Sequence, residues 1–574
     1  MTTLNSTDYQ VIGSNETALF ALKAYRGEGM LLLAMNWKEG QPPKDFVGFS
    51  IEYKEPNGDE FFVLKNRLSF ANDKGKVSTD STSSLLAPFQ KFRWVHFPRN
   101  ANLKGIFTYK VKPVFMNDKN ELSYGESQIA DVELQRETYP DILNVAFTRG
   151  YVSSQAFVDR YQSDGGVAAL LPPVAKAGLD YVPTHPEANE ALTWMGFEAT
   201  AEILKLLDDA IVDGEAEVKV VAYDLNLPEV VTRLEKLGER LKIIIDNSTG
   251  HGDEDSAETE AAKRLYQSSK GNVKRQHMGN LQHNKTIVVN GAKMQVALCG
   301  STNFSWRGFY VQANNALIVR GKDAIQPFIV AFNNYWKFDD VKNYGQTISA
   351  EWNALPLNGI DAKISFSPHS SSNALLDKIA ADIGQNTKSN LLYSLAFLYQ
   401  TDGPIKDALG KLTANDDIFV YGISDKKTGG LDFHKPNGNI SPVYASELSK
   451  NAPEPFKSEP NAGIGTRMHH KFVIIDFNTP DARVYLGSYN FSSTADRKNG
   501  ENLLLIKDKK IAIAYMIEAL RIFDHYHFRV SQKESAKTGI ILSLSRPPRN
   551  PEDKAWWQEY YTDAVKIKDR ELFY

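Results

Sequence analysis

Two short stretches of this 574-residue chain carry the same set of reactive side chains. Each copy has a histidine, a lysine two positions later, and an asparagine 20 or 21 positions after the histidine. The six residues are His283, Lys285, Asn303, His469, Lys471 and Asn490. An imidazole can act as a nucleophile or as an acid and base, while ammonium and amide groups neutralise phosphate oxygens. Brought together, the two copies would suit the cleavage of a phosphodiester.

The local sequence indicates how each copy is presented. Residues two apart on a strand point to the same face, so the histidine and lysine of each copy are expected to project together. Each asparagine ends a Gly-Ser-x-Asn sequence, which contains Ser301 in the first copy and Ser488 in the second. A single His-x-Lys is often chance or a surface strand. The matched duplication, with the second histidine 186 residues after the first, indicates one composite site.

In this combination the chain resembles the phospholipase D superfamily, whose signature is His-x-Lys, four residues, Asp, and then Gly-[Gly/Ser]-x-Asn. The second copy matches in full, with Asp476 at the acidic position, whereas the first has Asn290 there. The resemblance covers roughly residues 140–545. It implies hydrolysis or transfer through a covalent phosphohistidine, without a metal ion or other cofactor. It also implies a site between the two halves, for which a monomer is sufficient.

Asn290 is followed by Gly291, between two apolar runs. Both residue types tolerate positive φ, and this dipeptide predicts a tight hairpin turn. We interpret Asn290 as a turn residue remote from the reaction; the alternative is a loss of activity in this copy.

The two copies differ again after the asparagine, where the first has Asn314 and the second has Glu501. Members of the family place an acidic or amide side chain near here to hold a histidine. We expect Glu501 beside His469, where a carboxylate favours the protonated imidazole, and Asn314 beside His283, which would stay neutral. The hypothesis is therefore that His283 is the nucleophile and that His469 is the general acid and then the general base. The family's use of its N-terminal histidine agrees.

Two further residues are candidates for substrate contact. Arg307 follows Asn303 closely, and His369 opens the second half; structural packing and an ordinary loop histidine are the respective alternatives. His277 and His470 fit no metal-ligand spacing, so we expect no metal site. The only cysteine, Cys299, is expected to be a buried strand residue, and it excludes an intramolecular disulfide.

The elements that must position these residues fall into three regions. Residues 1–138 show short alternating runs and turn formers, which predict an all-β sandwich of fibronectin III or immunoglobulin type, outside the resemblance. Residues 139–352 and 353–574 interleave strands with amphipathic helices, which predicts two phospholipase D-like α/β domains with pseudo-twofold symmetry and parallel sheets. We expect a linker at 347–362. The tail, with Trp556-Trp557, is expected to pack as an extension of the second domain; an exposed lipid anchor is the alternative.

Composition and the chain ends bear on location and partners. The net charge of −4 gives no global attraction for a polyanion. Residues 1–6 lack a basic segment followed by an apolar one, and no apolar run reaches about 18 residues. We expect a cytoplasmic protein, with signal-independent secretion as the alternative.

The leading interpretation is a phospholipase D-like hydrolase that converts phospholipids to phosphatidic acid, which allows peripheral contact with a membrane. A metal-independent endonuclease of the same superfamily is the first alternative. A catalytically silent module that binds phosphodiesters or proteins is the second. Headgroup preference, transphosphatidylation, oligomeric state and the role of the β-sandwich stay open at this level.

Overall fold

The computed structural model shows two compact units. Unit 1 comprises Met1–Arg136 and Ile513–Tyr574, and unit 2 comprises Glu137–Ala512. Residues 1–6, which bear on the expected absence of a secretory signal, lie outside the described residues. The structure describes residues 9–72, 75–78, 81–98, 100–134, 137–150, 157, 160–398, 402–425, 431–443, 468–539, 542–550 and 552–574.

Unit 1 contains two antiparallel sheets that share one apolar core, and the predicted all-β sandwich is confirmed. The rings of Phe20 and Phe49, one from each sheet, lie 5.0 Å apart in this core. The fibronectin III or immunoglobulin type stays a prediction. The first sheet has the order β1 (Gln10–Ile12), β2 (Phe20–Arg26), β3 (Leu31–Trp37) and β8 (Arg93–His96). The second has β10 (Leu122–Tyr124), β9 (Ile106–Met116), β4 (Phe46–Lys54) and β5 (Phe62–Val63), with β11 (Gln128–Glu133) also paired to β9; β6 (Lys65–Asn66) and β7 (Thr82–Ser83) pair separately.

The C-terminal extension completes this core. It follows α11 (Lys509–Thr538) and contains α12 (Glu559–Thr562) and α13 (Ala564–Leu572). Trp557 is 6% exposed in the sandwich core, and the ring of Trp556 lies 5.5 Å from that of Phe46. The tail is therefore packed, as predicted, and the lipid-anchor alternative is wrong. It belongs to unit 1 rather than to the second α/β domain, because its aromatic side chains fill the sandwich.

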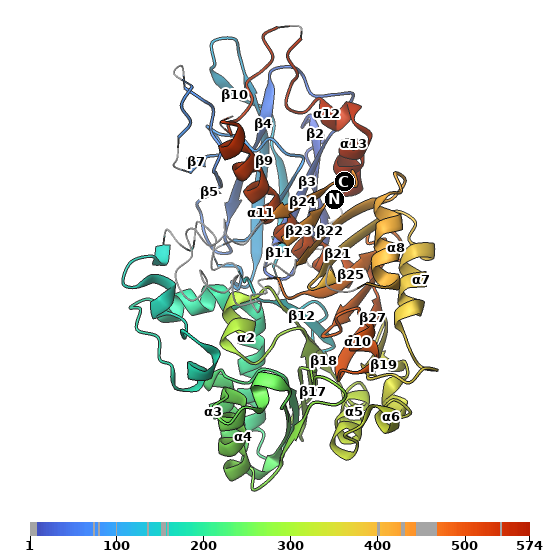
Figure 1. The fold of residues 1–574 in the computed structure, drawn as a ribbon. Coiled ribbons are helices and arrows are strands. Elements are labelled where there is room, and N and C mark those ends of the chain that lie inside the picture. Colours follow the sequence, from blue (N-terminus) through green and yellow to red (C-terminus); the bar gives the residue numbers. More distant parts are fainter. Residues whose placement is uncertain are drawn as a thin grey trace. The chain divides into compact units, whose positions relative to one another are not determined.

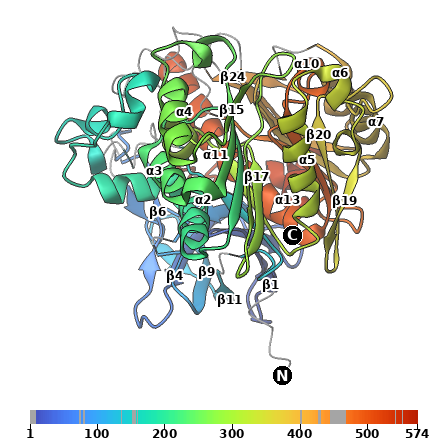
Figure 2. The ribbon, with the colours of Figure 1, turned by 90° about the horizontal axis from the view of Figure 1, so that it is seen from below.

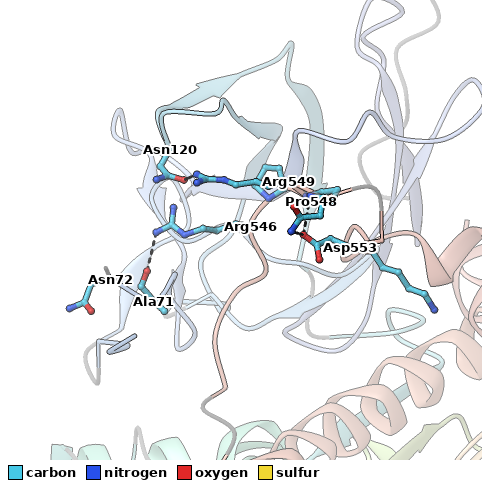
Figure 3. A pocket seen from close by; sticks show the side chains of 10 residues that line it. Ala71, Asn72, Asn120, Arg546, Pro548, Arg549 and Asp553 are labelled. Carbon is cyan, nitrogen blue, oxygen red and sulfur yellow. Dashed lines mark hydrogen bonds between the residues drawn. The ribbon is translucent and has the colours of Figure 1, made fainter. Parts of the chain in front are cut away.

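Polar contacts fix the start of the same extension to the loops of the sandwich (Figure 3). Arg546 donates a hydrogen bond to the carbonyl of Ala71 at 2.9 Å, and Arg549 donates to Oδ1 of Asn120 at 2.7 Å. These contacts and the buried tryptophan hold residues far apart in the sequence in one unit.

Unit 2 contains two sheets that share the order and direction of their central strands and differ at their edges, which confirms the duplicated α/β fold. Read across each sheet, the path β12-β18-β17-β16-β13-β14 of the first corresponds in order and direction to the path β20-β27-β26-β25-β21-β22 of the second. The first sheet has the order β12 (Leu143–Phe147), β18 (Asn315–Arg320), β17 (Gln295–Gly300), β16 (Thr286–Asn290), β13 (Glu217–Ala222), β14 (Leu241–Asp246) and β15 (Val273–Gln276). The second has β19 (Asn353–Leu357), β20 (Ile360–Ser367), β27 (Glu501–Lys507), β26 (Arg483–Gly487), β25 (Lys471–Ile475), β21 (Asn390–Leu395), β22 (Phe419–Asp425), β23 (Leu431–His434) and β24 (Ile440–Val443).

The sheets are mixed, so the prediction of parallel sheets is wrong. Only β13–β14, β14–β15 and β21–β22 pair in parallel among the described strands of unit 2. Short connections such as that between Asn290 and Gln295 allow only antiparallel pairing. This hairpin is not the expected tight turn, since neither Asn290 nor Gly291 has positive φ. The expected linker at 347–362 instead contains β19 and the start of β20, which pair with each other.

Helices cover both faces of the first sheet (Figure 2). Strand alternation turns Val220 and Ile243 toward α2 (Ala188–Val212), α3 (Pro228–Leu237) and α4 (Ala257–Ser268). On the other face, Nζ of Lys242 lies 4.2 Å from the ring of Trp336 in α5 (Gln326–Lys337). In the second half, α7 (Leu376–Asn386) and α8 (Pro404–Thr413) pack against β21 and β25 (Figure 1).

The short helices among the described residues of unit 2 are η1 (Gly166–Ala169), η2 (Ala175–Asp180), η3 (Gly238–Arg240), η4 (Thr249–Gly252), the π-helix η5 (Arg307–Val311), α6 (Val341–Tyr344), η6 (Ile348–Ala350) and α10 (Ser493–Arg497).

Two backbone bridges join the halves of unit 2. Gln282 pairs with Gly500, and Ala313 pairs with Met468, both in parallel. Each bridge therefore connects the residue before a motif histidine in one half to the residue before Glu501 or Asn314 in the other. Cys299 is buried in β17, as predicted. Among the described residues, no helix is both long enough and apolar enough to cross a bilayer.

Candidate active site

The two histidines face each other where the halves of unit 2 meet. Their ring centroids are 6.2 Å apart, and each residue is 4% exposed. Each motif lysine is buried next to its histidine and donates to that histidine's own carbonyl: Lys285 to that of His283, and Lys471 to that of His469 at 2.9 Å. Asn303 is buried and Asn490 is half-buried. Since the paired histidines and lysines adjoin the two motif asparagines, we propose these six side chains as one site.

The acidic and amide residues hold the histidines crosswise. Nδ1 of His283 lies 2.7 Å from Oε2 of Glu501, and Nδ1 of His469 lies 2.8 Å from Oδ1 of Asn314. The expected pairing of Glu501 with His469 and of Asn314 with His283 is therefore wrong. The reason lies in the two backbone bridges, which align each histidine with the strand start of the opposite half.

The motif serines fix these cross-pairs. Ser488 donates to Oε2 of Glu501 at 2.7 Å, and Ser301 donates to Oδ1 of Asn314 at 2.9 Å. The amide nitrogen of Asn314 donates to the carbonyl of Gly308, so its Oδ1 must face both the serine and the histidine. In each pair, then, the histidine Nδ1 is the donor. The supporting role predicted for both serines remains a proposal, and each serine makes a hydrogen bond through which it would act.

The pair of His283 and Glu501 favours a neutral imidazole beside a carboxylate. Burial lowers the pKa of His283, and Glu501 only partly opposes this effect. Burial would raise the pKa of Glu501, but His283, Lys285 and the Ser488 hydroxyl together hold it below its ordinary value. With Nδ1–H bound to the carboxylate, the lone pair lies on Nε2, for which the described residues supply no hydrogen-bond partner. This is the form that a nucleophile requires.

No carboxylate among the described residues is bonded to His469, and the charged groups that act on it are cations. Burial, followed by the charges of Lys471 and Lys285, holds its pKa well below its ordinary value. Burial also lowers the pKa of Lys285, to about 8, against the opposing effect of Glu501. A bound phosphate anion would counter the same repulsion and raise the proton affinity of His469.

Aromatic rings pack against each His-Lys pair. The ring of Tyr223 lies 4.7 Å from that of His283, with Nζ of Lys285 4.8 Å from its centroid. In the second half, the ring of Phe397 lies 6.4 Å from that of His469. The sequence analysis missed both rings, because their only signal is a position just after β13 and β21, and their significance depends on strand register.

A polar network extends from Asn303 and was also missed. Nδ2 of Asn303 donates to Asp224 at 2.8 Å. Nε2 of His251 lies 3.1 Å from the other oxygen of Asp224, and Nδ1 lies 2.8 Å from Asp246. Burial would lower the pKa of His251, but the two carboxylates raise it to about 10. The available signal was that Asp224 and Asp246 end neighbouring parallel strands, at the same edge of the sheet.

Three groups of this region have the residue types of a cation site. Ligand atoms of Asp224, His251 and Glu258 lie within 4.8 Å of one another. However, both nitrogens of His251 are directed at carboxylates, and Glu258 accepts the backbone N–H of Leu225 at 3.1 Å. The proton on Nε2 of His251 occupies the position from which that nitrogen would have to bind a cation. Hydrogen bonding therefore accounts for this arrangement, and the donor set does not fit a metal ion.

Asp476, the acidic residue of the signature, lies at the other end of β25. Its carboxylate is fully buried and accepts the backbone N–H groups of Lys388, Ser389 and Asn390 at 2.7–3.1 Å. It lies five residue steps along the strand from Lys471, a distance of about 16 Å. Its contacts are those of a structural residue. Asn290, at the corresponding end of β16, is exposed.

The structure distinguishes between His369 and Arg307, the two weaker candidates for substrate contact. His369 is fully buried, and its ring nitrogens lie 2.9 Å from Ser365 and 2.7 Å from Asp496, so it cannot contact substrate. The expectation that His369 contacts substrate is therefore wrong. Arg307 lies in the π-helix η5, and its charge lowers the pKa of His469, so it stays a candidate for substrate contact.

Comparisons with known proteins agree with the motifs. The family described as "Cardiolipin synthase, PLD-like domain" matches residues 208–336 and 379–522, so that each matched segment contains one copy of the motif. The phospholipase D of Rickettsia prowazekii (strain Madrid E) is 44% identical over 48 residues, which are 8% of this chain and 22% of that protein. The chain thus spans about a fifth of the length of the curated relatives it matches.

Solved structures show more distant likeness. The polyphosphate kinase of Porphyromonas gingivalis is 11% identical, with a TM-score of 0.36 and coverage of 92% of this chain and 80% of that chain. The phosphatidylserine synthase of Haemophilus influenzae Rd KW20 is 16% identical, with a TM-score of 0.39 and coverage of 65% and 93%.

The crosswise pair predicts the effect of Glu501→Gln. The amide cannot carry the charge that would stabilise a cationic His283, so kcat toward bis(p-nitrophenyl) phosphate should fall about 10²- to 10⁴-fold. The matched variant Asn314→Asp should instead raise the pKa of His469 and, with an alkyl phosphodiester whose leaving group needs a proton, move the alkaline limb of the pH–rate profile to higher pH. Equal activity of Glu501→Gln and wild type, with both folded by circular dichroism, would contradict the pairing.

Asp476→Ala should affect stability rather than chemistry. Removing a buried acceptor of backbone N–H groups should lower the free energy of unfolding by about 1–3 kcal/mol, measured by denaturant titration. Turnover per folded molecule should stay within about threefold of wild type. Asp481→Ala, at an exposed surface ion pair, is the control and should change stability little. A large loss of turnover without a stability change would return Asp476 to the chemistry.

Proposed function

We propose that this chain, which belongs to the phospholipase D superfamily, is a phosphodiesterase that hydrolyses phospholipid headgroups through a covalent intermediate on His283. The observation that carries the proposal is the crosswise pairing. It gives one neutral imidazole backed by the Glu501 carboxylate and a second imidazole, His469, backed by an amide. Two identical histidines thereby acquire different chemistry.

In the first step, Nε2 of His283 attacks phosphorus and forms an N–P bond while the bond from phosphorus to the leaving oxygen breaks. The leaving oxygen takes the proton from Nε2 of His469 and departs as the alcohol. Glu501 stabilises the positive charge on the His283 ring. Lys285, Lys471 and the asparagine amides neutralise the phosphoryl oxygens.

In the second step, Nε2 of His469 removes a proton from water, whose oxygen attacks phosphorus. The N–P bond breaks, and His283 returns to its neutral form with Nδ1–H on Glu501. For a phospholipid, the products are phosphatidic acid and the free headgroup alcohol. Each proton transfer has a named donor and acceptor, so the cycle closes with both histidines in their starting states.

The choice of a lipid substrate rests on the relatives. The matching family is described by cardiolipin synthase, and the curated relatives are named phospholipase D. The net charge of −4 gives no general attraction for DNA. The endonuclease is therefore the second candidate. The presence of both complete sets of His, Lys and Asn opposes a silent binding module.

The test is a substrate panel in EDTA with phosphatidylcholine, phosphatidylethanolamine, cardiolipin and plasmid DNA, scored by released headgroup and by nicking. We expect headgroup release by the wild type, and none by His283→Ala. Nicked plasmid alone would replace the lipid proposal with the nuclease. No turnover of any substrate would support the silent module.

The same preparation identifies the nucleophile. With His469→Ala, which lacks the base for the second step, a ³²P-labelled substrate with a good leaving group should leave label on His283, located by peptide mapping. Label on His469 in the wild type would reverse the assignment.

The pKa shifts predict an acidic optimum. His283 must be neutral and His469 protonated in the free enzyme, and both pKa values lie below the ordinary imidazole value. The profile of kcat/KM for an alkyl phosphodiester should therefore peak below about pH 6.5 and fall at higher pH as His469 loses its proton. With bis(p-nitrophenyl) phosphate, whose leaving group needs no proton, the alkaline fall in the first step should disappear. Identical profiles for both substrates would contradict the acid role of His469.

A further inference from the structure

One carboxylate adjoins the phosphate-binding groups in the first half of unit 2. Asp224 accepts a hydrogen bond from Nδ2 of Asn303, and its charge acts on both Lys285 and Arg307. Its side chain is 23% exposed, whereas His283 and Lys285 are nearly inaccessible. Asp224 is thus a solvent-accessible anion among the groups that the proposed mechanism assigns to phosphate.

The described residues of the second half supply no equivalent charge beside Asn490. Strand register places Asp224 two residues beyond the position level with Lys285, and Phe397 two residues beyond the position level with Lys471. The counterpart of Asp224 in the second half is therefore the uncharged ring of Phe397, which lies 6.4 Å from the ring of His469. Within the described part of the chain, no carboxylate bonds to Asn490. The pseudo-twofold symmetry of the site is therefore broken by one negative charge.

The surroundings of Asp224 keep this charge in place. His251 donates from Nε2 to Asp224 and is itself held by Asp246 through Nδ1. Burial would raise the pKa of Asp224, but His251, Lys285 and Arg307 hold it below its ordinary value. The carboxylate is therefore ionised at neutral pH and cannot rotate away without breaking its bonds to His251 and Asn303.

We infer that Asp224 is a specificity-determining residue that lets the site bind a phosphodiester monoanion and reject a phosphomonoester dianion. The inference rests on the proposed function. Lys285, Lys471 and Arg307 alone would favour the more highly charged ligand. A monoester loses its second proton near pH 6, so its extra charge at neutral pH meets the fixed carboxylate of Asp224. The product of the reaction is such a monoester, and the same repulsion promotes its release.

The experiment compares two ligands that differ in one charge, methyl phosphate and dimethyl phosphate, by calorimetry at pH 7.5. Wild type should bind the dimethyl ester more tightly than the dianion. In Asp224→Asn, which keeps the size of the side chain, the ratio of the two dissociation constants should shift at least about tenfold toward the dianion.

A second variant should shift the ratio of the two dissociation constants in the opposite direction. His251→Gln keeps a donor for Asp224 and removes a positive charge, so it should shift the ratio away from the dianion. Asp208→Asn, an exposed ion-pair residue on α2, is the control and should leave the ratio unchanged. If Asp224→Asn does not fold, the direction of the shift in His251→Gln decides the question.

An unchanged ratio in Asp224→Asn would overturn the inference. Equal changes in both constants would also overturn it, because Asp224 would then act only by orienting Asn303. Either result, with lipid turnover by the wild type intact, leaves the proposed function standing. A wild type that binds neither ligand and turns over no member of the substrate panel would remove the proposed function together with this inference.

Discussion

The crosswise hydrogen bonds between the halves of unit 2 are the constraint on which the site depends. Neither half can orient its own histidine, because the side chain that accepts the Nδ1 proton comes from the other half. The backbone bridges at Gln282–Gly500 and Ala313–Met468 set this exchange before any side chain is considered. Duplication alone would give two copies of a motif, whereas the exchange makes them one site.

Burial makes small differences between the copies important. A carboxylate and an amide of similar size hold the two histidines in similar geometry, but the low-dielectric surroundings convert the difference of one charge into different protonation behaviour. The serines and the carbonyl of Gly308 complete the hydrogen bonding of Glu501 and Asn314, so neither can reorient cheaply. The cations around His469 then make its proton dependent on a bound anion.

Asymmetry recurs beyond the histidines. In the first half, Asp224, His251 and Asp246 form a charged network beside Asn303, whereas strand register places Phe397 at the position of Asp224 in the second half. The sheets differ too, since β15 is a parallel edge strand and β23–β24 form a hairpin. A shared strand order thus supports two halves with different chemical surroundings.

The sequence by itself determined the six motif residues, the duplicated α/β fold and the N-terminal sandwich, because spacing and periodicity are local properties that reactive side chains and strands must satisfy. It also indicated the difference between Asn314 and Glu501. Only the tertiary structure decided which histidine each of them holds, since that depends on pairing between residues 218 and 155 positions apart. For the same reason, the roles of Asp476, His369 and Asp224 depend on strand ends and burial that no local pattern records. The burial of Trp557 in the sandwich core is another contact between distant segments, so the sequence of the tail alone does not record it.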